Sequence, residues 1–521
     1  MTFSPSTFTP PTDQQLRAFV DCAEEFATTL RRLEFSDESL RRVLGAEGLA
    51  ALDRGEPGVV DVLLTETEGV SADTVTALRL LILGDFADAE QLFGAELTAK
   101  LLDSGILAGT AANAQVCIDV RPVEIAGVDR IVFSDRDASM SDHVPGPDHV
   151  LGVGRASRSL LDISPTSAVE SVLDLGAGCG IQSLAQPDAK SIVATDIHPR
   201  ALFFARATFA ANSFDQAQAL EGSWFEPVAG QKFDRIVANP PFVVGLPSVE
   251  HVYRDSGLNL DGATELMIRN LADYLTDGGT AHLLGAWAHI EGESWQQRIA
   301  SWLPAEGLEV WVTQRDLATP AEYIGTWLRD ESIDPRSPEG CERSRAWLEH
   351  FRNSGVTGIG FGYITVQRIN GPTSAACEEM PQPLGAPFAA EAEEYLGRAE
   401  WLRTQTAGTI LEAAFTVRPG VAIERVSLAD VESGQGFTEF DTRISRTDGP
   451  AWTHSIDESV ATVLGALHPE AALGSVIDIM AMFGAFDESK VPAIKDALVP
   501  IVVDLVRHGL ILPTELLEDK Q

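Results

Sequence analysis

Ser171-Val172-Leu173-Asp174-Leu175 is an apolar run that leads directly into the glycine-rich stretch Gly176-Ala177-Gly178-Cys179-Gly180. A buried strand that ends in such a loop is typical of the carboxyl edge of a parallel sheet, where open α/β folds bind their ligands. Glycines remove side chains from the loop, so the backbone can turn tightly and press against a cofactor. The alternative is that the glycines only form a tight turn from strand to helix.

A second apolar run, Ile192-Val193-Ala194-Thr195, ends at Asp196, twenty residues after Gly176. A carboxylate at that position can accept hydrogens from both ribose hydroxyls of a nucleoside. The loop is spaced GxGxG and not GxGxxG, the spacing of nicotinamide dinucleotide sites. The pattern therefore favours S-adenosylmethionine, which has no pyrophosphate. The predicted cofactor-binding residues are Gly176, Gly178, Gly180, Asp196 and its neighbour Ile197, with Asp174 either bonding the cofactor or capping the following turn.

Asn239-Pro240-Pro241-Phe242 follows a further apolar run that ends at Ala238, which places Asn239 at the same edge of the sheet as the glycine loop. Two prolines fix their own backbone angles and push the preceding residue away from helical geometry. The Asn239 side-chain oxygen and the Pro240 carbonyl can each accept one hydrogen of an NH2 group, while Phe242 stacks on a flat amide or base. We predict these three residues to be catalytic, with Asn239 also beside the cofactor; the alternative is a proline-rich turn capped by Asn239.

Together these motifs resemble the class I methyltransferases with a small methyltransferase domain, among them the release-factor glutamine methyltransferases and the RNA-base N-methyltransferases. The resemblance covers residues 148–370, and the whole arrangement resembles an actinobacterial group of methyltransferases. It implies a Rossmann-like α/β fold with a sheet of seven strands whose last strand is reversed. It also implies S-adenosyl-L-methionine as the cofactor, S-adenosyl-L-homocysteine as the product, and a planar nitrogen as the methyl acceptor.

The resemblance assigns roles to residues outside the two motifs. Ser223 stands where related enzymes often carry an acid that contacts the adenine amino group, and Trp224 either packs on the adenine or belongs to the core. Arg155 either pairs with the cofactor's carboxylate or lies on the surface. Tyr253-Arg254-Asp255-Ser256-Gly257 is expected to form part of a substrate lid.

The net charge of −39 and the scattered cysteines limit the possible partners and locations. Such an acidic surface repels phosphate backbones, so broad binding of DNA is not expected. The five cysteines have no metal-site spacing, so we expect no bound metal. The chain shows neither a secretory signal nor an apolar stretch long enough to span a membrane, and we expect a cytoplasmic protein.

The pattern along the chain predicts three domains and a linker. Residues 14–33 and 72–93 read as helices, and the ending Leu101-Leu102-Asp103-Ser104-Gly105-Ile106-Leu107 resembles Leu505-Val506-Arg507-His508-Gly509-Leu510-Ile511. Either a repeated winged-helix-like unit or a common helix ending accounts for this likeness. We expect a mainly helical, winged-helix-like N-terminal domain at 1–140, the cofactor-binding domain at 141–370, a proline-rich linker at 371–387, and a C-terminal α+β domain, also considered winged-helix-like, at 388–521.

The motifs define the methylated atom more closely than the molecule that carries it. The extra domains suggest a macromolecule, either a protein with a glutamine side chain or an RNA base. The negative charge favours a protein, whereas a phenylalanine at position 242 favours nucleic acid, since glutamine methyltransferases usually carry tyrosine there. A small-molecule methyltransferase of specialised metabolism and a non-catalytic cofactor-binding module are the alternatives. The oligomeric state stays open.

Overall fold

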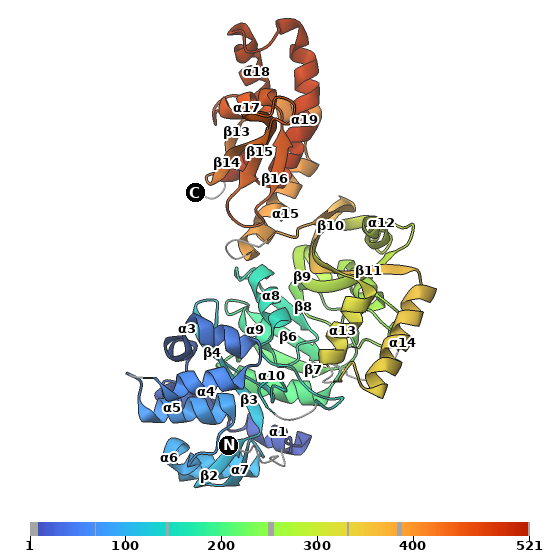
Figure 1. Ribbon diagram of the computed structural model, residues 1–521. Coiled ribbons are helices and arrows are strands. Elements are labelled where there is room, and N and C mark those ends of the chain that lie inside the picture. Colours follow the sequence, from blue (N-terminus) through green and yellow to red (C-terminus); the bar gives the residue numbers. More distant parts are fainter. Residues whose placement is uncertain are drawn as a thin grey trace. The chain divides into compact units, whose positions relative to one another are not determined.

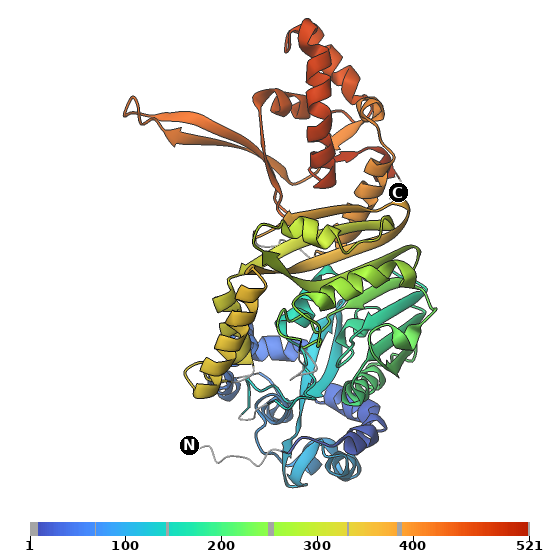
Figure 2. The same ribbon diagram turned by 90° about the vertical axis from the view of Figure 1, so that its right-hand side faces the viewer.

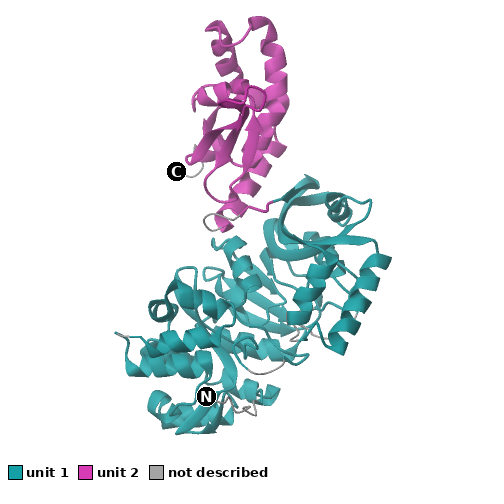
Figure 3. Cartoon of the chain, viewed as in Figure 1, with its two compact units in different colours: residues 1–379 teal, residues 380–521 magenta. Residues whose placement is uncertain are grey.

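The computed structural model describes residues 9–67, 69–141, 145–247, 255–330, 333–382 and 388–518. These residues form two compact units, Met1–Glu379 and Met380–Gln521 (Figure 3). In the described part of the chain, no helix is long and apolar enough to cross a membrane. The same residues contain no cluster of histidine, cysteine and acidic side chains that could hold a metal ion.

One eight-stranded, mostly parallel sheet forms the centre of the first unit (Figure 1). Its buried strands carry almost uninterrupted apolar residues, as expected for a sheet with helices on both faces. Strand β11 (Val356–Pro372) is antiparallel to both of its neighbours in this sheet. From edge to edge the strands are β12 (Ser374–Glu379), β10 (Glu306–Ala318), β11 (Val356–Pro372), β9 (Leu275–Ile290), β8 (Phe233–Ala238), β5 (Ser171–Leu175), β6 (Ser191–Asp196) and β7 (Ala217–Glu221).

The expected α/β sheet with a reversed seventh strand is confirmed, but an eighth strand corrects the predicted linker. Strand β12 pairs in parallel with β10, starting with Ser374 opposite Glu309. It comes from the segment 371–387, whose prolines suggested an irregular connection. Pro372 ends β11 and Pro381 follows β12, so the proline-free residues between them keep every backbone N–H needed for pairing.

Helices cover the sheet, and a helical pair fills the insertion between β10 and β11. Helix α11 packs against β9, and α10 packs beside β6 and β7. The helices of this region are α8 (Arg155–Ile163), α9 (Ile181–Leu184), α10 (Pro199–Ala211), α11 (Gly262–Tyr274), α12 (Trp295–Ala300), α13 (Pro320–Asp330) and α14 (Pro338–Asn353).

The N-terminal region is mainly helical, as expected, and it ends in two hairpins. It shares a hydrophobic core with the sheet. Its last hairpin packs on α10, where the backbone N–H of Phe133 donates to Thr208 Oγ1 at 3.2 Å. The ring of Phe133 also lies 4.9 Å from that of Phe19. The elements are α1 (Asp13–Val20), α2 (Ala23–Arg32), α3 (Asp37–Asp53), α4 (Pro57–Thr65), α5 (Ala72–Leu78), α6 (Ala89–Phe93), α7 (Ala95–Asp103), β1 (Leu107–Thr110), β2 (Asn113–Val116), β3 (Ile118–Ile125) and β4 (Val128–Asp135).

The second unit combines helices with short sheets, and one of its hairpins extends away from the rest of the unit (Figure 2). That hairpin consists of β14 and β15, which pair antiparallel. The elements are α15 (Ala389–Arg403), α16 (Ala407–Glu412), β13 (Phe415–Val417), β14 (Val421–Ala429), β15 (Phe437–Arg446), β16 (Thr453–Ile456), α17 (Glu458–Gly465), α18 (Leu473–Met482), α19 (Val491–Arg507), β17 (Ile511–Pro513) and α20 (Glu515–Glu518).

The two similar sequence endings have similar structures. Helix α7 is followed by Gly105 at φ +68° and then β1, and helix α19 is followed by Gly509 at φ +66° and then β17. A glycine in the left-handed region is a common way to end a helix. The winged-helix-like character of both flanking domains and the domain boundaries other than the linker stay predictions.

Candidate functional site

A cavity of about 890 Å³ opens at the carboxyl ends of the central strands. It is lined by the loop after β5, by the ends of β6, β7 and β8, and by residues 148–158 before and within α8. Two more walls come from elements outside the sheet, namely the hairpin β3–β4 and helix α13. A pocket at this edge is where parallel α/β sheets bind ligands.

The first two glycines of the loop face this cavity, as expected. Gly176 and Gly178 line it, and their φ angles of +72° and +54° lie in the region that residues with side chains rarely adopt. A Cβ on Gly178 would meet nothing within 4 Å, so the backbone here borders open space. A Cβ on Gly176 would lie 3.9 Å from the Cα of Pro240, so the two predicted motifs lie next to each other.

Gly180 has a different role from the one predicted, because it does not line the cavity. Its φ is +81°, and a Cβ at this position would lie 2.7 Å from the ring of Phe209 and 3.3 Å from the Cα of Ala205. Both neighbours belong to α10. The third glycine therefore lets α10 approach the start of α9, which is a packing function.

Asp196 lies at the end of β6 with its carboxylate at the cavity wall. Its Oδ2 accepts a hydrogen bond of 3.0 Å from the N–H of Gly178, and Oδ1 accepts one of 2.9 Å from the N–H of His198. Each oxygen keeps a lone pair for a ligand, because a carboxylate offers about four acceptor positions. Burial raises the pKa of this carboxyl group above its usual value.

Three further predicted residues line the cavity beside Asp196. Ile197 is 56% exposed, which is unusual for a large apolar side chain and suits contact with a flat ligand. Ser223 and Trp224 come from the loop after β7. Trp224 has a φ of +49°, a costly conformation for a bulky residue, and such strain is concentrated at ligand sites.

Asp174 does not line the cavity, and its contacts match the cap, one of the two roles considered for it. Its Oδ2 accepts hydrogen bonds from the backbone N–H of Ser183 at 3.0 Å and from Ser183 Oγ at 2.7 Å. Oδ1 is buried and has no hydrogen-bond partner in the described part of the chain. Burial raises the pKa of this carboxyl group from 3.8 to about 7.

Replacing Asp174 with asparagine should stabilise the folded chain at pH 8 but not at pH 4. Well below pH 3.8, Asp174 is protonated in both the folded and the unfolded chain and makes no difference. As the pH rises, the carboxyl group loses its proton in the unfolded chain before it does so in the folded chain. Once both states are ionised, the free energy of unfolding of the wild type is therefore lower by on the order of 4 kcal/mol. Asparagine accepts the same bonds from Ser183 without this penalty.

Thermal unfolding of the Asp174→Asn variant at pH 4.5 and pH 8 checks this expectation. The variant's melting temperature should exceed that of the wild type at pH 8, and the difference should shrink at the lower pH. The matched control is Asp188→Asn, which changes an exposed aspartate. An equal shift for Asp174→Asn at both pH values would contradict the prediction.

Asn239, Pro240 and Phe242 all line the cavity, as expected from their place after β8. The side chain of Asn239 makes no hydrogen bond within the part of the chain that the structure describes. An amide that stands free in a pocket can hold a ligand, since polar groups in folded chains otherwise find partners. The ring of Phe242 lies 5.3 Å from that of Phe361 on β11.

The helical insertion supports the Asn-Pro-Pro-Phe loop, a role that the sequence did not indicate. The N–H of Val244 donates a 2.8 Å hydrogen bond to the hydroxyl of Tyr323 on α13. A Cβ on Gly245 would lie 3.0 Å from the ring of Trp347 on α14, so the backbone passes directly under this ring. Trp327 also lines the cavity from α13. The insertion therefore forms one wall of the site.

Other predicted residues lie at the margin of the site. Arg155 lines the cavity at the first turn of α8 and is exposed, with no ion pair in the described part of the chain. Of the expected lid, Asp255 and Ser256 line the cavity, whereas Tyr253 and Arg254 lie outside the described residues. Cys179 lines it too, but burial raises its thiol pKa to about 12, so it is not a thiolate nucleophile at neutral pH.

Comparison with known proteins supports the character of this site. Residues 151–284 match the family model of the methyltransferase small domain, and residues 393–513 match a domain of unknown function, DUF7782. The stretch that matches the methyltransferase small domain holds the glycine loop, Asp196 and Asn239. In the second unit, the DUF7782 match covers most of the described residues.

Two glutamine methyltransferases are among the similar proteins. The chain is 31% identical over 157 residues to the release factor glutamine methyltransferase of Xylella fastidiosa (strain Temecula1 / ATCC 700964), covering 28% of this chain and 55% of that protein. It is 30% identical over 187 residues to the ribosomal protein uL3 glutamine methyltransferase of Bradyrhizobium diazoefficiens, covering 32% and 57%. The chain thus spans about half the length of these relatives.

A solved structure of the T. thermophilus 16S rRNA N2 G1207 methyltransferase in complex with AdoMet and guanosine is also similar. It is 18% identical, covers 44% of this chain and 64% of its own, and has a TM-score of 0.26. A TM-score this low carries no argument about the function of the chain.

Proposed function

We propose that the chain is an S-adenosyl-L-methionine-dependent N-methyltransferase that acts on a planar nitrogen. The observation that carries this proposal is the unpartnered Asn239 amide, which lies in one cavity with Gly176 and Asp196. These residues come from three neighbouring strands, in the order β8, β5, β6. A free amide beside a nucleoside-binding carboxylate suits transfer from a nucleoside cofactor to an NH2 group.

The cavity residues fit S-adenosylmethionine. The spare lone pairs of Asp196 would accept hydrogens from the ribose hydroxyls, and the side-chain-free Gly178 would let the cofactor lie on the loop backbone. Ile197 and Trp224 would cover the adenine, and the Ser223 hydroxyl would bond its edge. Arg155 lines the same cavity from the first turn of α8.

Amide and exocyclic-amine nitrogens are weak nucleophiles because their lone pairs are delocalised, so orientation matters most. The bound cofactor supplies an electrophilic methyl group on a sulfonium. Asn239 Oδ1 and the Pro240 carbonyl would accept the two hydrogens of the NH2 group, which turns the nitrogen towards that methyl group. Phe242 would pack on the plane of the amide, and the helical insertion would exclude water. Transfer would form a bond from this nitrogen to the methyl carbon as the bond from carbon to sulfur breaks, and one N–H proton would pass to water.

A protein glutamine is the proposed acceptor. The two relatives described above are named for glutamine methylation, and the net charge of −39 disfavours approach of a polyanion. An RNA base is the second candidate, because position 242 carries phenylalanine. We place the protein in the cytoplasm, since all five cysteines are unpaired, as expected in a reducing compartment.

Transfer of a labelled methyl group tests this function. The purified full chain is incubated with methyl-labelled S-adenosylmethionine and a cell extract, and the product is then treated with protease or with ribonuclease. We expect label that survives ribonuclease, is released by protease, and appears as N-methylglutamine after hydrolysis under conditions that preserve the amide. Label released only by ribonuclease would move the acceptor to RNA. No labelling in either fraction, together with no binding of S-adenosylhomocysteine, would refute the function.

A further inference from the structure

The hairpin β3–β4 places polar side chains on the face that lines the cavity. Asp119 and Arg121 lie two residues apart on β3, so their side chains share one face, and Ser134 of β4 is the direct partner of Asp119. All three line the cavity. The opposite face carries Val120 and Phe133, which are buried in the core. The N-terminal region therefore contributes a polar wall to the site.

This wall carries a buried pair of opposite charges. Asp119 and Arg121 are 6% and 4% exposed. Among the described aspartates and arginines that line the cavity, they alone are less than one-tenth exposed. Burial of an ion pair is costly, and it is offset only when the remaining hydrogen-bonding positions are also used.

The contacts within this pair leave both groups incompletely satisfied. One bond joins them, from Arg121 Nη2 to Asp119 Oδ1 at 3.3 Å, and Asp137 Oδ2 lies 3.7 Å from the same Nη2. Asp119 Oδ2 accepts no hydrogen bond from the described residues, and Arg121 Nε is buried without a partner among them. The carboxylate has an unused acceptor oxygen and the guanidinium has an unused donor. A cavity wall with both suits a ligand that carries a positive and a negative charge.

The pair lies close to the glycine loop. A Cβ on Gly152 would lie 3.4 Å from Asp119 Oδ2 and 2.3 Å from Ser134 Oγ, so the irregular segment before α8 runs directly over this wall. Gln182 of α9 also lines the cavity, and its buried Oε1 has no partner among the described residues. Burial is the main cause of the raised pKa of Cys179, and the charge of Asp119 contributes to it as well.

We propose that Asp119 and Arg121 hold the amino-acid end of S-adenosylmethionine, with Asp119 accepting from the ammonium group and Arg121 donating to the carboxylate. The inference rests on the proposed function. If Asp196 takes the ribose and Asn239 faces the transferred methyl group, the zwitterionic end needs an anion and a cation elsewhere on the wall. The buried pair on β3 supplies both, and it does so from outside the methyltransferase small domain.

Two ligands that differ only at this end separate the contributions. S-adenosylhomocysteine carries the ammonium and carboxylate groups, whereas 5′-methylthioadenosine lacks both and keeps the adenosine and sulfur. Calorimetric titration of the full chain should show that the wild type binds S-adenosylhomocysteine more tightly. Arg121→Met and Asp119→Asn should each weaken its binding by roughly 10- to 100-fold and change that of 5′-methylthioadenosine by less than about threefold.

The matched control is Arg130→Met. Arg130 lies on β4 of the same hairpin, over the ring of Phe214, and does not line the cavity, so both affinities should stay at the wild-type level. Arg121→Lys keeps the charge beside Asp119 and should lose less affinity than Arg121→Met. If Arg121→Met fails to fold, two measurements still test the proposal. One is the affinity of Arg121→Lys, and the other is the comparison of the two ligands on the wild-type chain.

The outcomes distinguish this inference from the proposed function. If the wild type binds both ligands equally, the amino-acid end has no dedicated site and the inference is wrong, while the function stands. If the folded Arg121→Met and Asp119→Asn variants lose both ligands to the same extent, the pair is structural and the inference is also wrong. If the wild type binds neither ligand, the proposed function itself fails.

Discussion

Methyl transfer should fall by about 10²- to 10³-fold in an Asn239→Ala variant, whereas binding of S-adenosylhomocysteine should remain at the wild-type level. The Asn239 amide makes no hydrogen bond within the described structure, so its removal breaks no contact that holds the fold. Its expected contribution is confined to orienting the acceptor nitrogen. That contribution is large because the nitrogen has little intrinsic reactivity and must meet the methyl group in line.

Single-turnover transfer with labelled cofactor measures the loss, and calorimetry measures cofactor binding on the same preparation. Asn270→Ala is the matched control, since Asn270 lies on α11 and bonds the carbonyl of Leu266, outside the cavity. It should transfer at the wild-type rate. Wild-type transfer by Asn239→Ala would remove this residue from the mechanism, and loss of binding would assign it to the cofactor instead.

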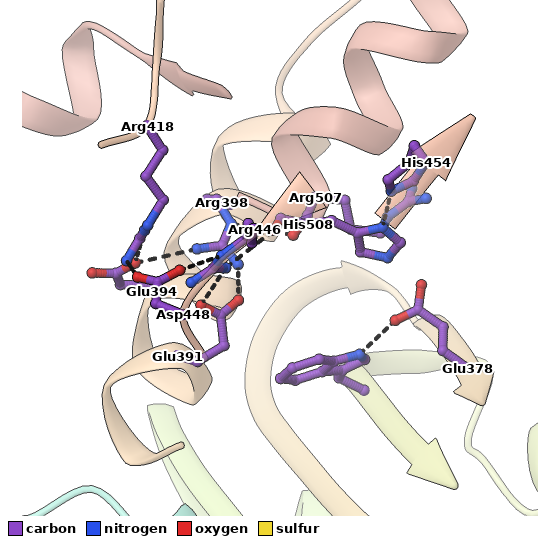
Figure 4. A network of polar contacts seen from close by, with 11 residues as sticks. Glu378, Glu391, Glu394, Arg398, Arg418, Arg446, Asp448, His454, Arg507 and His508 are labelled. Carbon is purple, nitrogen blue, oxygen red and sulfur yellow. Dashed lines mark hydrogen bonds and ion pairs between the residues drawn. The ribbon is translucent and has the colours of Figure 1, made fainter. Parts of the chain in front are cut away.

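Replacing Glu391 with glutamine should destabilise the second unit by about 3–5 kcal/mol. Glu391 is buried on α15 and pairs with two buried arginines, Arg398 and Arg446 (Figure 4). Arg446 Nη1 donates to Glu391 Oε2 at 2.7 Å and to the carbonyl of His508 at 3.1 Å. Arg398 Nε donates to the carbonyl of Arg507 at 3.2 Å.

The network therefore joins α15 and β15 to the end of α19, and the carboxylate is the anion between two cations. Glutamine keeps the shape of Glu391 but removes the anion between the two guanidinium groups. Their remaining carboxylate partners, Glu394 and Asp448, are 25% and 43% exposed and offset the buried charges less well. Desolvated like charges of this kind are costly, since water cannot screen them. Gly509, which follows the helix, lies directly against both arginines, because a Cβ there would lie 2.9 Å from Arg446 Nη1 and 3.1 Å from Arg398 Nη1.

Hydrogen exchange of the full chain, followed by mass spectrometry of its peptides, locates and measures this loss. Peptides from residues 388–518 should exchange faster in Glu391→Gln, while those from the central sheet should not change. The control is Arg425→Gln, which removes an ion pair with Glu458 whose side chains are 60% and 66% exposed. Such a pair contributes less than about 1 kcal/mol. Equal protection in Glu391→Gln and the wild type would contradict the prediction.

The sequence was most informative where the chemistry depends on neighbours along the chain. The glycine loop, Asp196 and Asn239 each follow directly after an apolar run, and the carboxyl ends of parallel strands meet at one edge. Their place in one cavity could therefore be expected without any knowledge of the packing. The same local reasoning explains why the two helix endings at Gly105 and Gly509 have similar structures.

Local patterns were misleading where a residue's role depends on what packs against it. Gly180 and Gly178 share a motif, yet Gly180 meets Phe209 and Gly178 borders open space. Asp174 could bond a cofactor or cap a turn, and its bonds to Ser183 decide for the cap. Strand β12 was hidden between prolines because its pairing partner β10 is more than sixty residues away in the chain.

By itself, the sequence determined the strand ends that carry the glycine loop, Asp196 and Asn239, because strand periodicity and turn residues act over a few positions. Only the tertiary structure decided which surfaces close the site. The two-residue spacing of Asp119 and Arg121 indicates a polar face on β3. It does not indicate that this face lines the cavity. Helices α13 and α14 likewise reach the Asn-Pro-Pro-Phe loop only through folding. Such contacts join residues far apart in the chain, and they depend on the packing of whole layers rather than on local preference.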